Sequence, residues 1–197
     1  MSEKIIFEEK DNGAWIPINY SPYRWIPPGG PGPMGVCGDL LLTEENLIFK
    51  GRKTGQLSGK KYDITIPLKN ASFNLKKPDF WSPPPFTSLY VESVNGEFLA
   101  QFKSKKLEEW KKAIEKQIIK LLLGKKFYTR YKGQISRNVF QGSFGSLFET
   151  IQKAHEKYNT DISVDELYTL HTTVYNPALT RAAKDQFKDL LKDIKQT

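Results

Sequence analysis

The amino-acid sequence predicts an α+β protein, in which a curved antiparallel sheet is closed by an amphipathic helix and followed by a small helical unit. Two features of the hydrophobic pattern predict this class. Between residues 38 and 102, apolar and polar side chains alternate in short runs separated by turn residues, which is typical of antiparallel strands. From residue 104 onward, apolar side chains recur at helical spacing instead.

Six short strands are expected between residues 38 and 102. The last two flank Asn95-Gly96, a dipeptide that favours a type I′ hairpin turn, because that turn needs positive φ at both central residues. Residues 1–36 hold short apolar runs and a stretch rich in proline and glycine, and their role in the sheet is left open. The six expected segments are 38–43, 46–50, 62–68, 70–75, 88–94 and 97–102.

The closing helix is expected to begin near Ser104, whose hydroxyl can accept an unpaired backbone N–H of the first turn. Gly124 is expected to end it. Its apolar stripe would cover the open end of the sheet, because a partly open barrel otherwise exposes its apolar interior. The stripe consists of Leu107, Trp110, Ile114, Ile118 and Leu121.

These elements divide the chain into three expected parts: a β-barrel domain at 1–124, a linker at 125–143, and a three-helix unit at 144–197. Within the helical unit, Ser163 and Glu166 match a capping box that would open the second helix. Pro177 is expected in the first turn of the last helix, where its missing N–H leaves no hydrogen bond unmade.

Composition and charge limit the classes of function. The 197 residues include 30 Lys and Arg against 22 Asp and Glu, a formal net charge of +8, and residues 37–143 hold all of the excess. Such asymmetry favours an anionic partner, either phosphorylated lipid headgroups or nucleic acid, although Lys-rich loops also keep small domains soluble. One cysteine and two histidines leave no internal disulfide and little for a zinc site, so a reducing, cytoplasmic location is expected.

The densest group of cations lies in the connection between the second and third expected strands. An inositol phosphate needs several Lys or Arg donors in one loop, because charge-assisted hydrogen bonds hold each phosphate most strongly. A solvated hairpin loop without a ligand is the alternative interpretation. The predicted phosphoinositide-binding residues are Lys50, Arg52, Lys53, Lys60 and Lys61.

A Pro-rich loop between the fourth and fifth expected strands contains Phe80 and Trp81. These rings are candidate membrane contacts, since aromatic side chains insert into a bilayer interface, and the neighbouring prolines could instead dock onto a WW or SH3 domain. The interpretation that we favour is that the rings fold back onto the domain as a small apolar cluster.

No pattern typical of catalysis is found. His155 and His171 lie in predicted helices without a Ser, Cys or carboxylate at a matching spacing, so we expect no enzyme, no metal site and no cofactor. The basic and aromatic segment 127–132 could stack on single-stranded nucleic acid and neutralise it. Signatures of RRM and OB folds are absent, so a packed linker is favoured there and nucleic acid is not the expected partner.

The segment Gly38–Phe49 resembles the start of GRAM and GLUE domains, which share the pleckstrin-homology fold: a glycine, an apolar strand ending in Thr or Ser, a short variable turn, and an apolar strand ending in an aromatic residue. Residues 64–68 followed by Phe73 are similar to the next hairpin of these families. Trp110 is similar to the tryptophan common in pleckstrin-homology helices. The resemblance covers residues 38–123.

This resemblance implies a membrane-trafficking adaptor rather than an enzyme. GLUE domains occur in a subunit of the ESCRT-II complex, and members of that family bind phosphoinositides and, in some cases, ubiquitin. The implied partners are an anionic membrane lipid and a protein bound by the helical unit or the Pro-rich loops. The alternative is a protein-interaction adaptor, for example a ubiquitin-binding one, without specific lipid binding. The implied location is the cytoplasm, with peripheral attachment to endosomal or other internal membranes.

Overall fold

The computed structural model describes residues 4–16, 34–51, 63–76, 87–93, 95–135, 140 and 142–196. The chain forms two compact units, Met1–Ala113 and Ile114–Thr197. Their boundary falls inside the helix α1 (Leu107–Leu122), before the end of the first domain that the sequence predicts at residue 124.

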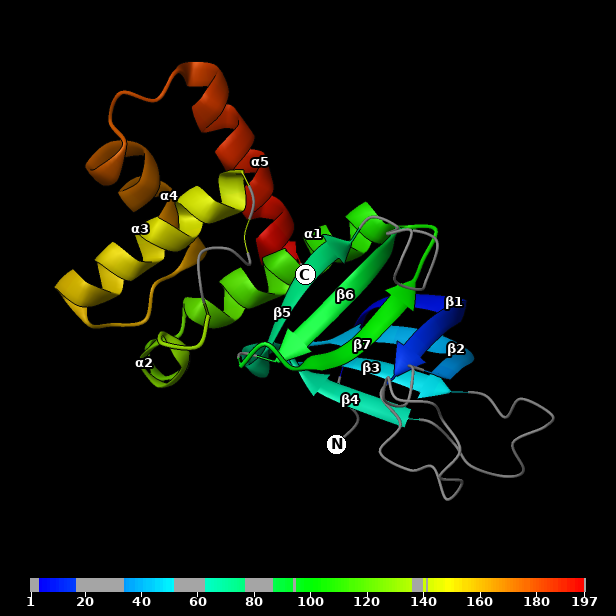
Figure 1. Ribbon diagram of the computed structural model, residues 1–197. Helices are drawn as coiled ribbons and strands as arrows, with labels where there is room; N and C mark the ends of the chain where they lie inside the picture. The colour runs from blue at the N-terminus through cyan, green and yellow to red at the C-terminus, as the bar shows by residue number, and fades with distance from the viewer. Residues whose placement is uncertain are drawn as a thin grey trace. The chain divides into compact units, whose positions relative to one another are not determined.

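The first unit is built on an antiparallel sheet of seven strands in the order β4-β3-β2-β1-β7-β6-β5 (Figure 1). Strand β1 pairs with β2 along its whole length but with β7 only at Gly13–Trp15, so it joins the two halves of the sheet. Together with the helices, this sheet confirms the α+β class. The strands are β1 (Ile5–Ile16), β2 (Met34–Thr43), β3 (Asn46–Gly51), β4 (Asp63–Pro67), β5 (Ala71–Lys76), β6 (Ser88–Ser93) and β7 (Phe98–Lys103), and the 3-10 turn η1 (Leu68–Asn70) joins β4 to β5.

The sheet is strongly curved. In a flat sheet, β3 and β7 would lie about 14 Å apart, since two strands separate them and neighbouring strands are about 4.8 Å apart. The rings of Phe49 on β3 and Phe102 on β7 nevertheless have centroids 5.7 Å apart, and both side chains are buried. The two halves of the sheet therefore bend toward each other and enclose an apolar core.

The six predicted strands correspond to β2–β7, and β1 comes from residues 1–36, whose role in the sheet the sequence left open. The segment 8–13 is polar and contains asparagine and glycine, a composition that suggests a turn rather than the middle of a strand. In the structure it forms a bulge: the register with β2 shifts between Glu9 and Asn12, and Asp11 has a φ of 60°. Part of residues 1–36 thus adds a strand to the sheet.

The hairpin expected at Asn95-Gly96 is present, but its predicted turn type is wrong. Gly96 has a φ of 80°, but a type I′ turn centred on Asn95-Gly96 would be closed by bonds between residues 94 and 97, whereas the described bonds join Ser93 to Gly96 and to Glu97. Ser93 N–H donates to the carbonyl of Glu97 and Gly96 N–H donates to that of Ser93. The loop is therefore one residue longer than predicted and ends on a left-handed glycine, as three-residue hairpin loops do.

The start of α1 is fixed to β1 by one carboxylate. Glu9 accepts hydrogen bonds from Trp110 Nε1 at 2.6 Å, from the hydroxyl of Ser104, and from the backbone N–H of Lys105. The Trp110 ring is fully buried and meets Phe7 edge-on, with centroids 4.6 Å apart. The Ser104 hydroxyl also accepts the N–H of Lys106, which precedes the first residue of α1, Leu107, so Ser104 lies before the helix and does not cap its first turn as predicted.

The second unit is helical and holds the C-terminal part of α1. Its core contains Ile118, Leu147, Phe148 and Phe187 among its buried apolar side chains. The segment predicted as a linker begins with the helix α2, in which Tyr128 is buried and stacks on His155 at a centroid distance of 4.3 Å. The helices are α2 (Lys125–Tyr131), α3 (Ser143–Tyr158), α4 (Val164–Thr169), the π-helix η3 (Leu170–Tyr175) and α5 (Arg181–Gln196).

The sequence predicts the start of α4 correctly and the start of α5 incorrectly. The capping box is present as predicted: Ser163 accepts the backbone N–H of Glu166, and the Glu166 carboxylate accepts that of Ser163. The prediction for Pro177 is wrong, because α5 begins only at Arg181. There the Thr180 hydroxyl accepts the N–H of Ala183 at 3.3 Å and acts as the cap.

Candidate functional site

Of the five predicted lipid-binding residues, only Lys50 falls among the described residues. Its side chain is exposed near the end of β3, and its Cα partners across the sheet are Asp39 on β2 and Asp63 on β4. Cross-strand partners lie on the same face of a sheet with Cβ atoms about 5 Å apart, so Lys50 has an acidic residue as its neighbour on each side. The remaining four residues, Arg52, Lys53, Lys60 and Lys61, and the predicted membrane contacts Phe80 and Trp81 lie outside the described residues.

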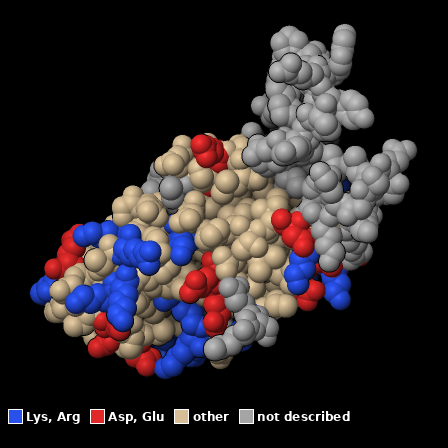
Figure 2. All heavy atoms as spheres, turned by 90° about the horizontal axis from the view of Figure 1, so that it is seen from below, with Lys and Arg blue, Asp and Glu red and all other residues tan. Residues whose placement is uncertain are grey.

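The aromatic side chains considered for nucleic-acid stacking are used in packing. Tyr128 and Tyr131 are buried, and the ring of Phe127 lies 4.8 Å from that of Tyr131. Burial raises the pKa of Tyr128, and the nearby negative charge of Glu156 raises that pKa further. The exposed cations of α2 and its C-terminus are Lys126, Arg130 and Lys132. On the face drawn in Figure 2, Lys and Arg side chains gather with Asp and Glu side chains among them.

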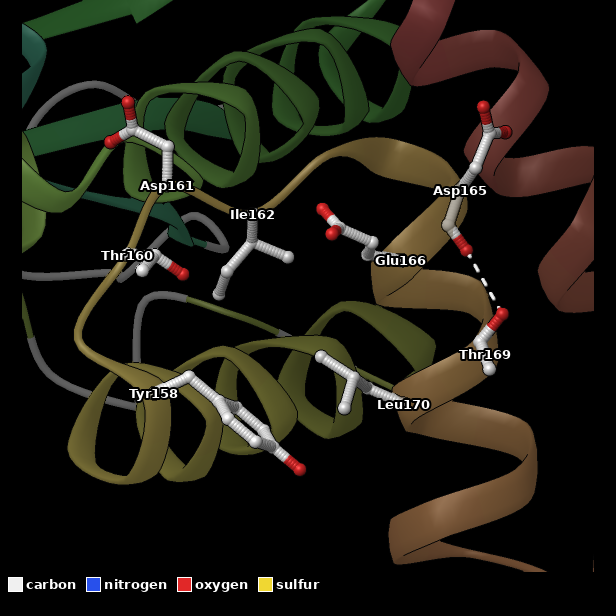
Figure 3. A pocket seen from close by; sticks show the side chains of 8 residues that line it. All are labelled: Tyr158, Thr160, Asp161, Ile162, Asp165, Glu166, Thr169 and Leu170. Carbon is white, nitrogen blue, oxygen red and sulfur yellow. Dashed lines mark hydrogen bonds between the residues drawn. The ribbon is translucent and has the colours of Figure 1, made fainter.

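The helical unit contains a pocket of about 610 Å³ where the end of α3, the loop after it and α4 meet; we call it the α3–α4 pocket. Its lining is largely apolar: Figure 3 shows the side chains of Ile162 and Leu170 with the ring of Tyr158 below them, and the carboxylate of Glu166 next to Ile162. The carboxylates of Asp161 and Asp165 lie above these side chains, on opposite sides of the view. The pocket is lined by Tyr158, Thr160, Asp161, Ile162, Asp165, Glu166, Thr169 and Leu170.

The loop that forms one wall of the pocket is held at both ends. Asn159 ends α3 in the left-handed conformation, with a φ of 53°, and its N–H donates to the carbonyl of His155. Asp161 accepts the backbone N–H of Lys125 at 2.7 Å, and the N–H of Ile162 donates to the carbonyl of Leu123 at 3.0 Å. The capping box then starts α4 immediately after the loop. These bonds fix the backbone that presents the pocket.

The side chains around the pocket carry negative charge. Asp165 forms an ion pair with Lys195 at 2.9 Å, and both side chains are largely exposed to solvent. Hydrogen bonds from the hydroxyl and the backbone of Ser163 lower the pKa of Glu166, which keeps this carboxylate ionised. No Lys or Arg is among the described lining residues.

The two histidines are buried and serve packing. His171, in η3, bonds through Nδ1 to the hydroxyl of Thr150 at 2.7 Å, and burial lowers the pKa of its ring. A hydroxyl bonded to an imidazole can act as a nucleophile that the histidine activates as a base. Thr150 and His171 are both at most 2% exposed, however, so a substrate cannot reach them. His155 bonds through Nε2 to the carbonyl of Leu122.

The described residues contain no group of three or more His, Cys, Asp or Glu side chains arranged to hold a metal ion. None of their helices has both the length and the apolar character needed to cross a bilayer.

Little in the sequence indicates the α3–α4 pocket. The helical spacing places Tyr158 on the inward stripe of α3, yet it is 44% exposed in the structure. An aromatic residue in the last turn of a helix, followed by a short polar loop and an acidic helix start, is the signal that could have indicated this site. Comparison with protein-family models, with curated proteins and with solved structures finds no match to this chain.

Proposed function

We propose that this protein is a non-enzymatic adaptor whose first unit is a pleckstrin-homology-like domain of the GRAM or GLUE type. A curved, seven-stranded antiparallel sheet that leads directly into an amphipathic helix is compatible with that fold. The buried Trp110, bonded to β1 through Glu9, supports it further, because the resemblance expects a tryptophan at this place. The proposed location is the cytoplasmic face of endosomal or other internal membranes.

The proposed ligand is a phosphoinositide or another anionic lipid, bound by the segment that joins β3 to β4. The observation that carries this proposal is the charge of residues 50–61, which include five cations and no Asp or Glu. Strands β3 and β4 hold the two ends of the segment together, since Lys50 and Asp63 are paired. Near an anionic membrane each cation contributes about 1 kcal/mol. Lys50 has Asp39 and Asp63 as its neighbours on the adjacent strands, so the proposal assigns the main attraction to Arg52, Lys53, Lys60 and Lys61.

Flotation of the full chain with lipid vesicles tests this function. Vesicles of phosphatidylcholine, of phosphatidylcholine with phosphatidylserine, and of phosphatidylcholine with a phosphoinositide are compared, the last two at equal total charge. We expect the strongest binding to the phosphoinositide vesicles, and we expect Arg52→Glu with Lys53→Glu to lower it at least tenfold. The matched control is Lys126→Glu with Arg130→Glu, which reverses two exposed cations of α2. Equal loss in both double variants, or equal binding to both anionic vesicles, would refute a specific site.

The second candidate function is a protein-interaction adaptor, of which a ubiquitin-binding module is one example. The α3–α4 pocket favours it, because an open, partly apolar pocket on a non-catalytic helical unit is typical of a surface that receives a partner side chain. The two functions are compatible, since the proposed lipid segment and this pocket belong to different units of the chain.

A further inference from the structure

We propose that the α3–α4 pocket binds a cationic peptide segment of a partner protein, which inserts one large apolar side chain between Tyr158, Ile162 and Leu170. This inference rests on the adaptor function proposed above and names its binding site and the chemistry of its partner. It does not depend on lipid binding by the first unit.

The apolar middle of the pocket supplies the anchor. Its volume of about 610 Å³ lies within the range of about 300–1,000 Å³ that is usual for ligand pockets, and a leucine or phenylalanine side chain fills only part of it. Tyr158 is 44% exposed, although its position on the α3 stripe would normally bury it. A large aromatic side chain left open beside Ile162 and Leu170 gains contact area when a partner covers it.

The acidic residues that line the pocket favour a cationic partner. Three of the eight lining residues are Asp or Glu and none is Lys or Arg, in a chain whose cations exceed its anions by 30 to 22. Each of the three carboxylates has a hydrogen bond or ion pair within the protein to one of its oxygens: Asp161 Oδ1, Asp165 Oδ2 and Glu166 Oε2. The other oxygen of each can accept a hydrogen bond from a lysine or arginine of the partner. An anionic membrane or an acidic peptide would be repelled at the same place.

Because the backbone around the α3–α4 pocket is already ordered, binding should cost little conformational entropy of the protein. The loop between α3 and α4 is held by the bonds of Asp161 and Ile162 to the segment 123–125, and α4 begins with a complete capping box. A site that is already ordered loses little conformational freedom when it binds, so a modest contact area is sufficient for measurable affinity.

Fluorescence anisotropy with the full chain and a labelled peptide of alternating leucine and lysine tests the proposal. We expect saturable binding that weakens with salt. The same peptide with serine in place of leucine, and one with glutamate in place of lysine, are each expected to bind at least tenfold more weakly. Amide chemical shifts should move for Tyr158, Ile162 and Leu170 on addition of the leucine–lysine peptide.

Two pairs of variants separate the pocket from the rest of the surface. Tyr158→Ser is expected to weaken binding at least fivefold, whereas Val174→Ser, which removes an apolar side chain of similar exposure (46%) outside the pocket, should leave it unchanged. Asp165→Asn should weaken binding about threefold and reduce its salt dependence. Its matched control is Asp189→Asn, because Asp189 is also exposed and also paired with a lysine of α5, but does not line the pocket.

Several outcomes would overturn the proposal. It is refuted if the glutamate peptide binds as well as the lysine peptide, or if each pocket variant and its control behave alike. A dimer that sedimentation detects and Tyr158→Ser abolishes would assign the pocket to a second copy of the chain instead. Vesicle flotation of Tyr158→Ser should equal that of the unaltered chain, so failure of the lipid function and failure of this inference can be told apart.

Discussion

The bond between Glu9 and Trp110 makes a quantitative prediction about how the sheet holds its helix. Replacing Glu9 with alanine leaves the indole N–H of a fully buried ring without its acceptor, and an unsatisfied buried donor costs about 1–3 kcal/mol. Ser104 and Lys105 lose the same acceptor, but both lie nearer to solvent and contribute less. We expect Glu9→Ala to lower the free energy of unfolding by about 2–4 kcal/mol. Glu8→Ala, at the exposed neighbouring position on β1, should change it by less than about 0.5 kcal/mol.

The assay is urea unfolding followed by circular dichroism, with Trp110→Phe added to complete a double-mutant cycle. If the indole bond carries the effect, then Glu9→Ala should cost less in the Trp110→Phe background, with a coupling energy of about 1–2 kcal/mol. Strictly additive effects, or a Glu9→Ala loss no larger than that of Glu8→Ala, would show that the carboxylate does not anchor the helix.

Three further predictions concern stability. Burial lowers the pKa of His171 below its usual 6.5, so at acidic pH the unfolded chain binds a proton that the folded chain does not. The free energy of unfolding should therefore fall as pH drops below about 6.5, by at most about 1.4 kcal/mol per pH unit. Unfolding measured at several pH values should show that His171→Asn removes this part of the slope. Gly38→Ala would place a Cβ 2.2 Å from the backbone oxygen of Lys50, so we expect a loss of about 2 kcal/mol or more in the same urea assay, and a loss below 0.5 kcal/mol would contradict the close β2–β3 packing. Ser163→Ala should cost about 1 kcal/mol by removing the cap of α4, whereas an unchanged midpoint would mean that the capping box contributes nothing.

Periodicity predicts those parts of the fold in which each strand or helix has one apolar face. Strands β3 and β5 follow this rule, and so does α3, whose Leu147, Phe148 and Ile151 are buried, whereas β2 buries Leu40, Leu41 and Leu42 in succession. Strand β1 does not, because its middle is a bulge, and the residues that suit a bulge, such as Asp11 and Asn12, also suit a turn. A local signal cannot distinguish these two outcomes; the pairing with β2 decides between them.

Local sequence preference is also a weak predictor of where a strand or helix begins and ends. Asn95-Gly96 predicts a hairpin correctly, but the type of turn depends on where the strands stop pairing, and β6 and β7 shift register between Val91 and Glu92. Pro177 suits the start of a helix, yet the side chain of Asn176 donates to the carbonyl of His171 and ends η3 there. The helix then starts at the next residue able to cap it, Thr180.

The α3–α4 pocket was beyond prediction for a different reason. Its lining comes from the last residue of α3, the following loop, α4 and the first residue of η3, and whether these enclose a hollow depends on how Asn159 redirects the chain. A sequence shows which side chains are apolar or acidic, but it does not show which of them face a common space.

Because the boundary between the two units falls inside α1, a fragment made to express the first unit must either cut this helix or include residues of the second unit. A fragment that stops at residue 113 leaves Trp110 on a helix cut to half its length. One that extends to residue 124 keeps that helix whole but carries Ile114, Ile118 and Leu122, which are buried in the intact protein, without the rest of the second unit to which they belong. The longer fragment is expected to aggregate unless those three positions are first made polar.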